Sequence, residues 1–355
     1  MPLSIQFPSF ISPEIIPGLP FRWYGLMYVF AFATAYFLYR RQVRSRHFPM
    51  DEETLSSMFF WCILSLLLGA RIFSTFVYEN PATNIYLREP WLIFWPFRNG
   101  QFTGLEGMSY HGGVLGCLIC IIVWSKRKHY DLREIGDMFA CAIPLGYTFG
   151  RLGNFFNQEL YGRVTDSPLG MIFPKANELF NPSLDWVREL AEKTGVPIPG
   201  DPRILINLPR YPTQLFEAFF EGIVLWFVLW MLRKRNPYKG FLFGAYVFGY
   251  SIIRFIIEYF REPDTDIGYR IQLGRSVTLS EIGYLHPLLS FSTGQILSLL
   301  MILAALIWWI IAAKLPDSQF VYDYSQKDEN SGTGSPCEDK KSKKNTRRNL
   351  RKKLR

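Results

Sequence analysis

Seven stretches of the chain are apolar, poor in charge and close to the length of a helix that crosses a membrane. The hydrocarbon core of a bilayer is about 30 Å thick and takes about 20 helical residues to cross. The longest piece between the stretches, a loop at about 163–212, is too small for an ordinary soluble domain. The pattern predicts an all-α polytopic membrane protein with about seven transmembrane helices. In chain order the stretches are 23–39, 55–78, 107–125, 135–150, 213–232, 241–259 and 288–313.

Basic residues are concentrated on alternate connections between these stretches. The connections after the first, third and fifth stretches carry four Lys or Arg each, and the segment after the seventh carries twelve, together 24 of the 39 in the chain. Because Lys and Arg are enriched in cytoplasmic loops, this predicts an N-terminus outside and a C-terminus in the cytoplasm. Residues 1–20 hold no Lys or Arg, so they lack the basic start of a cleaved signal peptide, and the first apolar stretch would direct the chain to the membrane.

The sequence divides into a membrane part and a polar tail. Residues 1–318 are expected to form an integral membrane domain that includes an extracytoplasmic loop at about 163–212. Residues 319–355 are polar, and ten of the last 16 residues are basic, so we expect a disordered cytoplasmic tail attracted to the anionic inner leaflet. Contact with a specific partner or with nucleic acid is the less favoured alternative for the tail, and the protein as a whole is not expected to bind nucleic acid.

The cysteines do not indicate a disulfide framework. Cys117 and Cys120 form a CxxC pattern, but it lies inside an apolar stretch with no second pair and no His nearby. We therefore interpret it as small packing residues, with a redox or metal site as the alternative. The other cysteines are Cys62, Cys141 and Cys337.

Polar and ionisable residues gather at one end of the predicted bundle. Arg151 follows 13 uncharged residues and Arg254 follows 14, which corresponds to roughly 20 Å of helix. Both arginines are therefore expected in a polar cavity inside the outer half of the membrane, where an unpaired charge is costly. With the orientation above, the residues at the outer ends are Tyr24, His111, Arg151, Asn154, Glu159, Gln214, Glu217, Arg254, Glu258 and Arg261.

Spacing places some of these residues on shared helix faces. The two sets are Arg254, Glu258 and Arg261, and Gln214, Glu217 and Glu221. Glu217 and Glu221 are expected mainly as partners of an arginine, because carboxylates at membrane depth need a counter-charge. The structural alternatives are packing at the membrane interface for His111 and Tyr24, a helix cap or turn for Asn154 and Asn157, and a simple ion pair for Arg254 and Glu258.

The densest run of polar residues is 150–162, with the sequence Gly-Arg-Leu-Gly-Asn-Phe-Phe-Asn-Gln-Glu-Leu-Tyr-Gly. Its three glycines are expected to allow tight turns. A guanidinium group binds phosphate through two parallel N–H groups, which an ammonium group cannot do. Two arginines at membrane depth, both facing outward, therefore indicate a protein that acts on a phospholipid headgroup from the outer face.

This run resembles the signature of the bacterial prolipoprotein diacylglyceryl transferases, and further matching segments follow in the family's order. The resemblance covers most of residues 20–313. Two regions depart from it: 262–291 is longer than is usual in the family, and the basic tail beyond Asp317 is an addition. The matching segments are 22–25 (Arg-Trp-Tyr-Gly), 111–113 (His-Gly-Gly), 211–217 (Tyr-Pro-Thr-Gln-Leu-Phe-Glu), 254–264 and 294–298 (Gly-Gln-Ile-Leu-Ser).

The resemblance implies a multi-pass transferase of the bacterial inner membrane, with its active site toward the extracytoplasmic side. It implies that the diacylglyceryl group of phosphatidylglycerol passes to the lipobox cysteine of a preprolipoprotein signal peptide, with a thioether formed, glycerol phosphate released and no metal or cofactor needed. It also implies catalytic roles for His111, as base or orienting group, and for Arg151 and Arg254, as phosphate ligands. The substrate-binding residues it implies are Tyr24, Asn154, Glu159, Gln214, Glu258 and Arg261.

Two other classes of function are open from the residues alone. A polytopic transporter of an anionic solute or lipid would also place arginines at membrane depth. Against it, the sequence has no visible internal repeat, and transporter sites lie near the membrane midplane. A structural scaffold with the tail as a docking arm would leave the buried charges unexplained.

Overall fold

The protein consists of two compact units, Met1–Val321 and Tyr322–Arg355. The predicted tail at 319–355 lies outside the described residues, as do parts of 262–291. In this computed structural model the described residues, all in the first unit, are 4–16, 18, 21–78, 85–95, 97–98, 101–102, 107–201, 203–262, 268–273, 277, 284 and 286–317.

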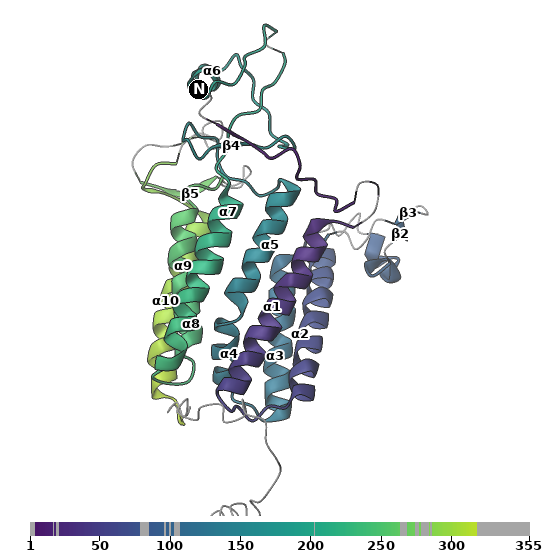
Figure 1. Ribbon diagram of the computed structural model, residues 1–355, viewed down its shortest axis with the longest axis vertical. Helices are drawn as coiled ribbons and strands as arrows, with labels where there is room; N and C mark the ends of the chain where they lie inside the picture. Colours follow the sequence, from purple (N-terminus) through teal and green to yellow (C-terminus); the bar gives the residue numbers. More distant parts are fainter. Residues whose placement is uncertain are drawn as a thin grey trace, which may run out of the picture. The chain divides into compact units, whose positions relative to one another are not determined.

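The first unit is built from long helices that run side by side (Figure 1). Each of the seven apolar stretches contributes helix, so the predicted helical architecture is confirmed in its coarse form. Two stretches contain a π-helical segment, labelled η1 and η4. The elements are α1 Trp23–Ser45, α2 Glu52–Phe73, η1 Ser74–Tyr78, α3 Tyr110–Lys128, α4 Leu132–Ala140, α5 Ile143–Asn157, α7 Thr213–Glu217, η4 Ala218–Val224, α8 Leu225–Leu232, α9 Phe241–Ile257 and α10 Thr293–Lys314.

Three helical segments in the described ranges are long and apolar enough to cross a membrane, judged by length and composition. They are Glu52–Val77, Thr213–Arg235 and Thr293–Lys314, and α9 is apolar but shorter. These helices agree with a membrane protein. The count of seven spans and the sides of the two termini stay predictions.

The fourth apolar stretch, predicted as one helix over 135–150, is two helices. The helix α4 ends at Ala140, and α5 begins at Ile143 with Pro144 in its first turn. A proline has no N–H and its ring clashes with the carbonyl group four residues earlier, which here belongs to Ala140. The prediction was also wrong about the end of this stretch, because α5 continues to Asn157.

Two of the glycines expected in tight turns are instead helical. Gly150 and Gly153 lie inside α5, and only Gly162 lies in the loop that follows. The last apolar stretch also begins differently from the prediction, since Ser290–Ser292 form the short strand β6 and α10 starts at Thr293. Ser292 caps α10: its hydroxyl accepts from the backbone N–H of Gln295, whose side chain accepts from the Ser292 N–H in return.

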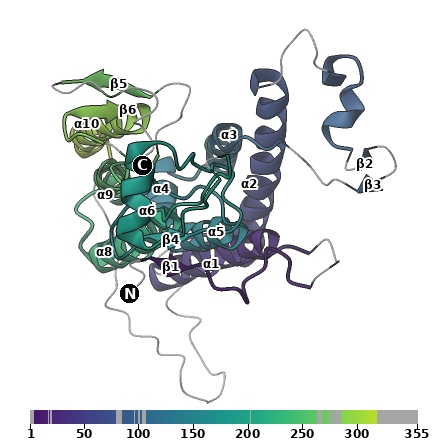
Figure 2. The same ribbon diagram turned by 90° about the horizontal axis from the view of Figure 1, so that it is seen from above.

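The helices pack as neighbouring pairs, with α2 against α3, α1 against α5, and α9 against α10. The helix α5 also packs against η4 and α8. Figure 2 gives the view of the helices from above. A Cβ atom at Gly222 of η4 would lie 2.0 Å from Thr148 Oγ1, so only glycine permits this approach. Thr148 Oγ1 donates to the Ala218 carbonyl group at 3.1 Å and holds the two segments together.

Loops, short strands and one helix cover the end of the bundle at which α1 begins (Figure 1). The loop at 163–212 contains α6, Asp185–Thr194, and β4, Met171–Ile172, which pairs in parallel with β1, Ile5–Gln6. A small apolar core holds this loop: Val164, Val187, Ala191, Ile206 and Leu208. Two antiparallel pairs also lie within the described ranges: β2 Phe97–Arg98 with β3 Gln101–Phe102, and β5 Tyr269–Gln272 with β6 Ser290–Ser292.

Candidate active site

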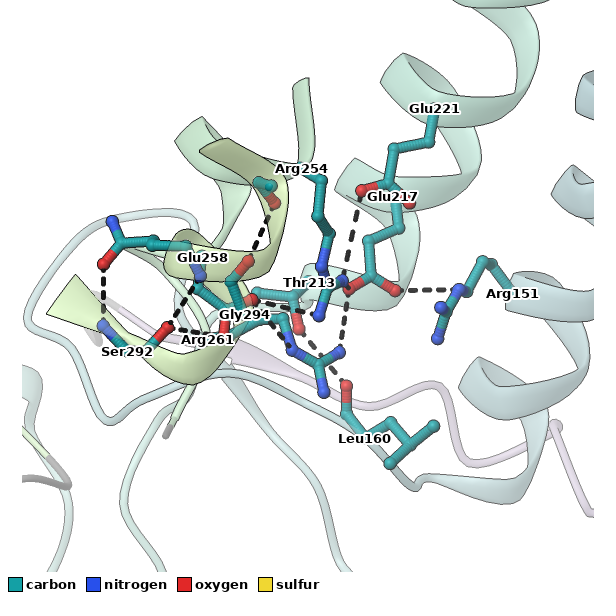
Figure 3. Close-up of polar contacts among 12 residues, drawn as sticks. Arg151, Leu160, Thr213, Glu217, Glu221, Arg254, Glu258, Arg261, Ser292 and Gly294 are labelled. Atoms are coloured by element: carbon teal, nitrogen blue, oxygen red, sulfur yellow. Dashed lines mark hydrogen bonds and ion pairs between the residues drawn. The ribbon is translucent and has the colours of Figure 1, made fainter. Parts of the chain in front are cut away.

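A buried carboxylate, Glu217, lies at the centre of the polar cluster. It is the last residue of α7, and its side chain is 0% exposed. Its Oε1 atom accepts hydrogen bonds from Nη1 of Arg254 at 2.7 Å and from Nη1 of Arg261 at 2.8 Å. Its Oε2 atom lies 2.9 Å from Nε of Arg151. Three guanidinium groups thus converge on one carboxylate (Figure 3).

Two further carboxyl groups balance the charge of the arginines. Glu258 Oε2 lies 3.0 Å from Nη2 of Arg254 and 3.8 Å from Nε of Arg261. Glu221 Oε1 lies 4.0 Å from Nη1 of Arg254. Breaking such buried ion pairs is strongly destabilising, because the remaining charge is left uncompensated. The predicted role of Glu217 and Glu221 as arginine partners is confirmed by these contacts.

The arginines differ in how many of their N–H groups are occupied. Arg254 places both terminal nitrogens against carboxylates. Arg151 instead uses Nε, which donates to the Tyr147 hydroxyl at 2.6 Å and lies beside Glu217. Neither terminal nitrogen of Arg151 donates a hydrogen bond to another described residue, and its side chain is 17% exposed. Arg151 is therefore the arginine best placed to bind an anion.

The start of α10 holds Glu258 in place. The Ser292 hydroxyl donates to Glu258 Oε1 at 3.0 Å. Gly294, in the first turn of α10, lies directly against the carboxylate, and a Cβ atom there would be 2.5 Å from Glu258 Oε1. A carboxylate at the N-terminus of a helix is favoured by the helix dipole. Only glycine at position 294 allows Glu258 to approach this closely.

The turn after α5 is held by contacts from α5 and α7. The carboxylate of Glu159 accepts from Asn154 Nδ2 at 2.8 Å and from Asn157 Nδ2 at 3.4 Å. The Glu159 carbonyl group accepts from Gln214 Nε2 at 2.7 Å. Gln214 is fully buried. The structure thus brings these residues together, with Gln214 on the backbone of the turn.

Arg261 reaches the cluster by a different route from the prediction. Its spacing from Arg254 predicted one continuous helix face, but α9 ends at Ile257, and Arg261 lies after a turn. There it forms a backbone bridge with Gly162, and the neighbouring Arg163 N–H donates to the Phe260 carbonyl group at 3.0 Å. This pairing of two loops turns the Arg261 side chain back toward Glu217.

Tyr24 and His111 lie on other helices at the same end of the bundle (Figure 1). The Tyr24 hydroxyl shares a hydrogen bond with that of Tyr28 at 3.0 Å, and its ring packs beside Gly153 of α5. His111 is the second residue of α3, with its ring edge-on to that of Tyr110, 5.8 Å between centroids. The roles of Tyr24 and His111 stay predictions.

Sequence reasoning missed two residues of the cluster, Tyr147 and Ser292. Tyr147 lies four residues before Arg151, which is one helical turn and could have suggested a contact. Ser292 lies three residues before Gln295, the spacing of a capping box. As for metals, no three His, Cys, Asp or Glu side chains within the described ranges are grouped so that they could hold an ion.

The chain matches one protein family over most of its length. The family model described as prolipoprotein diacylglyceryl transferase matches residues 12–311. The chain belongs to this family. Curated relatives named phosphatidylglycerol--prolipoprotein diacylglyceryl transferase include one from Treponema denticola, 52% identical over 322 residues (86% of this chain, 94% of the relative). Others come from Treponema pallidum, 51% identical over 318 residues (86% and 94%), and Chlorobaculum tepidum, 38% identical over 312 residues (85% and 91%).

The protein is therefore a transferase, and the resemblance found in its sequence is confirmed. Residues from four of the segments that carried the resemblance to the prolipoprotein diacylglyceryl transferases lie in the charged cluster. Arg151, Glu217 and Arg254 come from three of them, and Gly294, which lies against Glu258, comes from the fourth. The family signature is thus discontinuous in sequence and contiguous in space.

Proposed function

We propose that the protein transfers the diacylglyceryl group of phosphatidylglycerol to the lipobox cysteine of a preprolipoprotein, the first step of lipoprotein maturation. The names of its relatives support the two substrates. The observation that carries the proposal is Arg151, whose two terminal nitrogens donate no hydrogen bond to a described residue and lie beside a buried cluster of charges. A phosphodiester anion fits two parallel N–H groups of one guanidinium.

The reaction exchanges a carbon–oxygen bond for a carbon–sulfur bond. The thiolate attacks the glycerol carbon that carries the phosphate ester, and glycerol phosphate leaves with the electron pair of the broken C–O bond. The thiol proton passes to a base, because the thiolate is the nucleophile and a free cysteine has a pKa of about 8.5. Arg151 stabilises the charge that develops on the leaving phosphate. His111 serves as the base or orients the acceptor.

The remaining residues fall into two groups in this proposal. Arg254, Arg261 and Glu258 form the charged cluster with Glu217, and Arg254 also lies near the donor phosphate. Tyr24, Asn154 and Glu159 lie toward the glycerol of the donor. Because Gln214 is fully buried and donates to the Glu159 carbonyl group, we assign it to support of the turn instead of donor contact.

In the membrane, we propose seven spans with the N-terminus outside, the C-terminus in the cytoplasm, and the arginine cluster toward the extracytoplasmic side of the bacterial inner membrane. The cluster lies at the end of the bundle that carries the 163–212 loop, and the basic connections follow the other ends of α1, α3 and α8. A reporter fused after Arg355 should report the cytoplasm, and one inserted near Asp201 should report the outer side. The opposite labelling of either would contradict this arrangement.

The function is tested with purified protein, phosphatidylglycerol and a synthetic lipobox peptide. The peptide should gain the mass of one diacylglyceryl group, and glycerol phosphate should appear in equal amount. A peptide with serine in place of the lipobox cysteine should gain nothing. A folded, active relative from the family is the positive control. If the relative modifies the peptide and this protein does not, the proposal is refuted.

A further inference from the structure

Tyr147 occupies a bridging position in the charged cluster. It lies on α5, one turn before Arg151. Its hydroxyl accepts a hydrogen bond from Arg151 Nε at 2.6 Å and donates one to Glu221 Oε2 at 2.5 Å. The Arg151 guanidinium carbon lies 4.8 Å from the centre of the Tyr147 ring, a cation–π contact. One side chain therefore contacts Arg151 through both its ring and its hydroxyl.

These contacts are part of a closed circuit of side chains that includes both Arg151 and Arg254. Starting from Tyr147, the hydroxyl reaches Glu221 at 2.5 Å, and Glu221 lies 4.0 Å from Arg254. Arg254 donates to Glu217 at 2.7 Å, and Glu217 lies 2.9 Å from Arg151. Arg151 then returns to Tyr147 at 2.6 Å. This circuit joins α5, α7, η4 and α9, so the orientation of Arg151 is fixed relative to three other elements.

Within this circuit, Tyr147 and Glu217 act differently on Arg151. The Nε atom carries a single hydrogen, and the geometry directs it to the Tyr147 hydroxyl. The contact with Glu217 is an ion pair without a hydrogen bond, since Glu217 Oε2 accepts none among the described residues. Glu217 therefore provides the counter-charge of Arg151, and the Tyr147 hydroxyl fixes the orientation of its guanidinium group.

The orientation of the guanidinium group matters because it binds phosphate in its own plane, through a rigid pair of N–H groups. A rotation about the side chain would turn that pair away from the donor while leaving the charge in place. We propose that Tyr147 is a positioning residue, which holds the Arg151 guanidinium so that its two terminal nitrogens bind the phosphate of the donor lipid. This inference rests on the proposed function and adds a specific residue to it.

The test is Tyr147→Phe, which keeps the ring and removes only the hydroxyl. We expect kcat/KM for phosphatidylglycerol to fall about tenfold or more, the usual scale for a lost hydrogen bond to a charged group. The KM for the lipobox peptide should stay unchanged, because the proposal assigns Arg151 to the donor lipid. Tyr246→Phe is the matched control, since the Tyr246 hydroxyl makes no hydrogen bond among the described residues, and it should match the wild-type protein.

A double-mutant cycle separates positioning from a general structural role. In an Arg151→Lys background, Tyr147→Phe should cost less than a further twofold, because the guanidinium that it positions is already gone. An equal loss in both backgrounds, or wild-type kinetics in the single variant, would overturn the inference. If wild-type protein modifies the peptide while the cycle is additive, only this inference fails; if wild-type protein is inactive, the proposed function fails.

A second pair of variants serves if the phenylalanine variant does not accumulate in the membrane. Tyr147→Gln keeps an amide that can both accept and donate, and Tyr147→Met keeps neither. The glutamine variant should retain the larger share of kcat/KM for phosphatidylglycerol, at equal KM for the peptide. Equal kinetics of the two variants would contradict a role for the hydroxyl group.

Discussion

Arg151 and Glu217 are paired through the inner nitrogen of the guanidinium, with Nε 2.9 Å from Glu217 Oε2, so the terminal nitrogens of Arg151 extend away from the carboxylate (Figure 3). Arg254 is paired in the opposite way, with its terminal nitrogens on Glu217 and Glu258. Replacing the two arginines should therefore have different effects. Arg151 is arranged to bind a ligand, and Arg254 is arranged to hold the cluster together.

Replacing Arg151 with lysine should impair the use of the donor lipid and leave folding intact. Lysine keeps the positive charge but loses the paired N–H groups. We expect kcat/KM for phosphatidylglycerol to fall about ten- to hundredfold, corresponding to roughly 1.5–3 kcal/mol for a charged hydrogen bond. Steady-state kinetics with varied phosphatidylglycerol, together with thermal unfolding in detergent, measure the two effects.

Replacing Arg254 with lysine is the comparison for this prediction. Arg254 contacts Glu217 and Glu258 through two separate terminal nitrogens, and the shorter donor group of lysine loses that geometry, so Arg254→Lys should lower both activity and the unfolding temperature. If Arg151→Lys lowers the unfolding temperature as much as Arg254→Lys does, the assignment of separate roles to the two arginines is wrong.

Glu217 should be the most sensitive carboxylate in the cluster. Glu217→Gln leaves Arg151, Arg254 and Arg261 without their shared counter-charge, and removing one partner of a buried ion pair costs about 3–5 kcal/mol. Glu221→Gln should cost less, because Glu221 is 4.0 Å from its arginine and the amide oxygen can still accept from Tyr147. Denaturant unfolding in micelles measures both variants. Equal destabilisation would argue against Glu217 as the centre of the cluster.

His111 should be tested through the pH dependence of turnover. A positioned imidazole is well matched to take a thiol proton near neutral pH, and its loss usually costs about two to four powers of ten. His111→Gln should therefore be slow near pH 7 and recover partly as pH approaches the pKa of the thiol. His129→Gln, at the other end of α3, is the matched control. A deficit that is constant from about pH 6 to pH 9 would make His111 an orienting residue instead of the base.

His286 should make the fold sensitive to acid. Its ring packs against those of Tyr259 and Tyr269, and burial, together with the charge of Arg163, lowers its pKa from 6.5 to about 4. The unfolded chain then binds the proton more readily than the folded protein, so stability is lost as pH falls from about 6.5 toward 4. In His286→Gln the unfolding temperature should change less between pH 7 and pH 5. An identical decline in both proteins would contradict this pKa.

Much of the site could be predicted from the sequence, because charged residues beside apolar stretches stand out and must find partners. Arg151, Glu217 and Arg254 were recognisable in this way, and the structure brings them together. Helix spacing also predicted the contact between Arg254 and Glu258, which is an i, i+4 pair. These predictions succeeded because each depends on a local pattern or on a cost that any fold must meet.

Other features depend on contacts between distant segments, and the sequence alone could not provide them. A tyrosine in an apolar stretch resembles an ordinary packing residue, and the partner that distinguishes Tyr147 is Glu221, 74 positions away. Arg261 was placed on the face of α9 because nothing in its spacing revealed that the helix ends at Ile257. The break between α4 and α5 was the exception, since Pro144 was a visible signal for it.

A structure of the protein with phosphatidylglycerol bound in a lipid nanodisc, and with no acceptor peptide present, would show whether Arg151 binds the phosphate of the donor. We expect two phosphate oxygens at about 2.7–2.9 Å from the two terminal nitrogens of Arg151, with Nε still donating its hydrogen to the Tyr147 hydroxyl. A phosphate bound elsewhere, with the terminal nitrogens of Arg151 turned onto protein acceptors, would contradict this expectation.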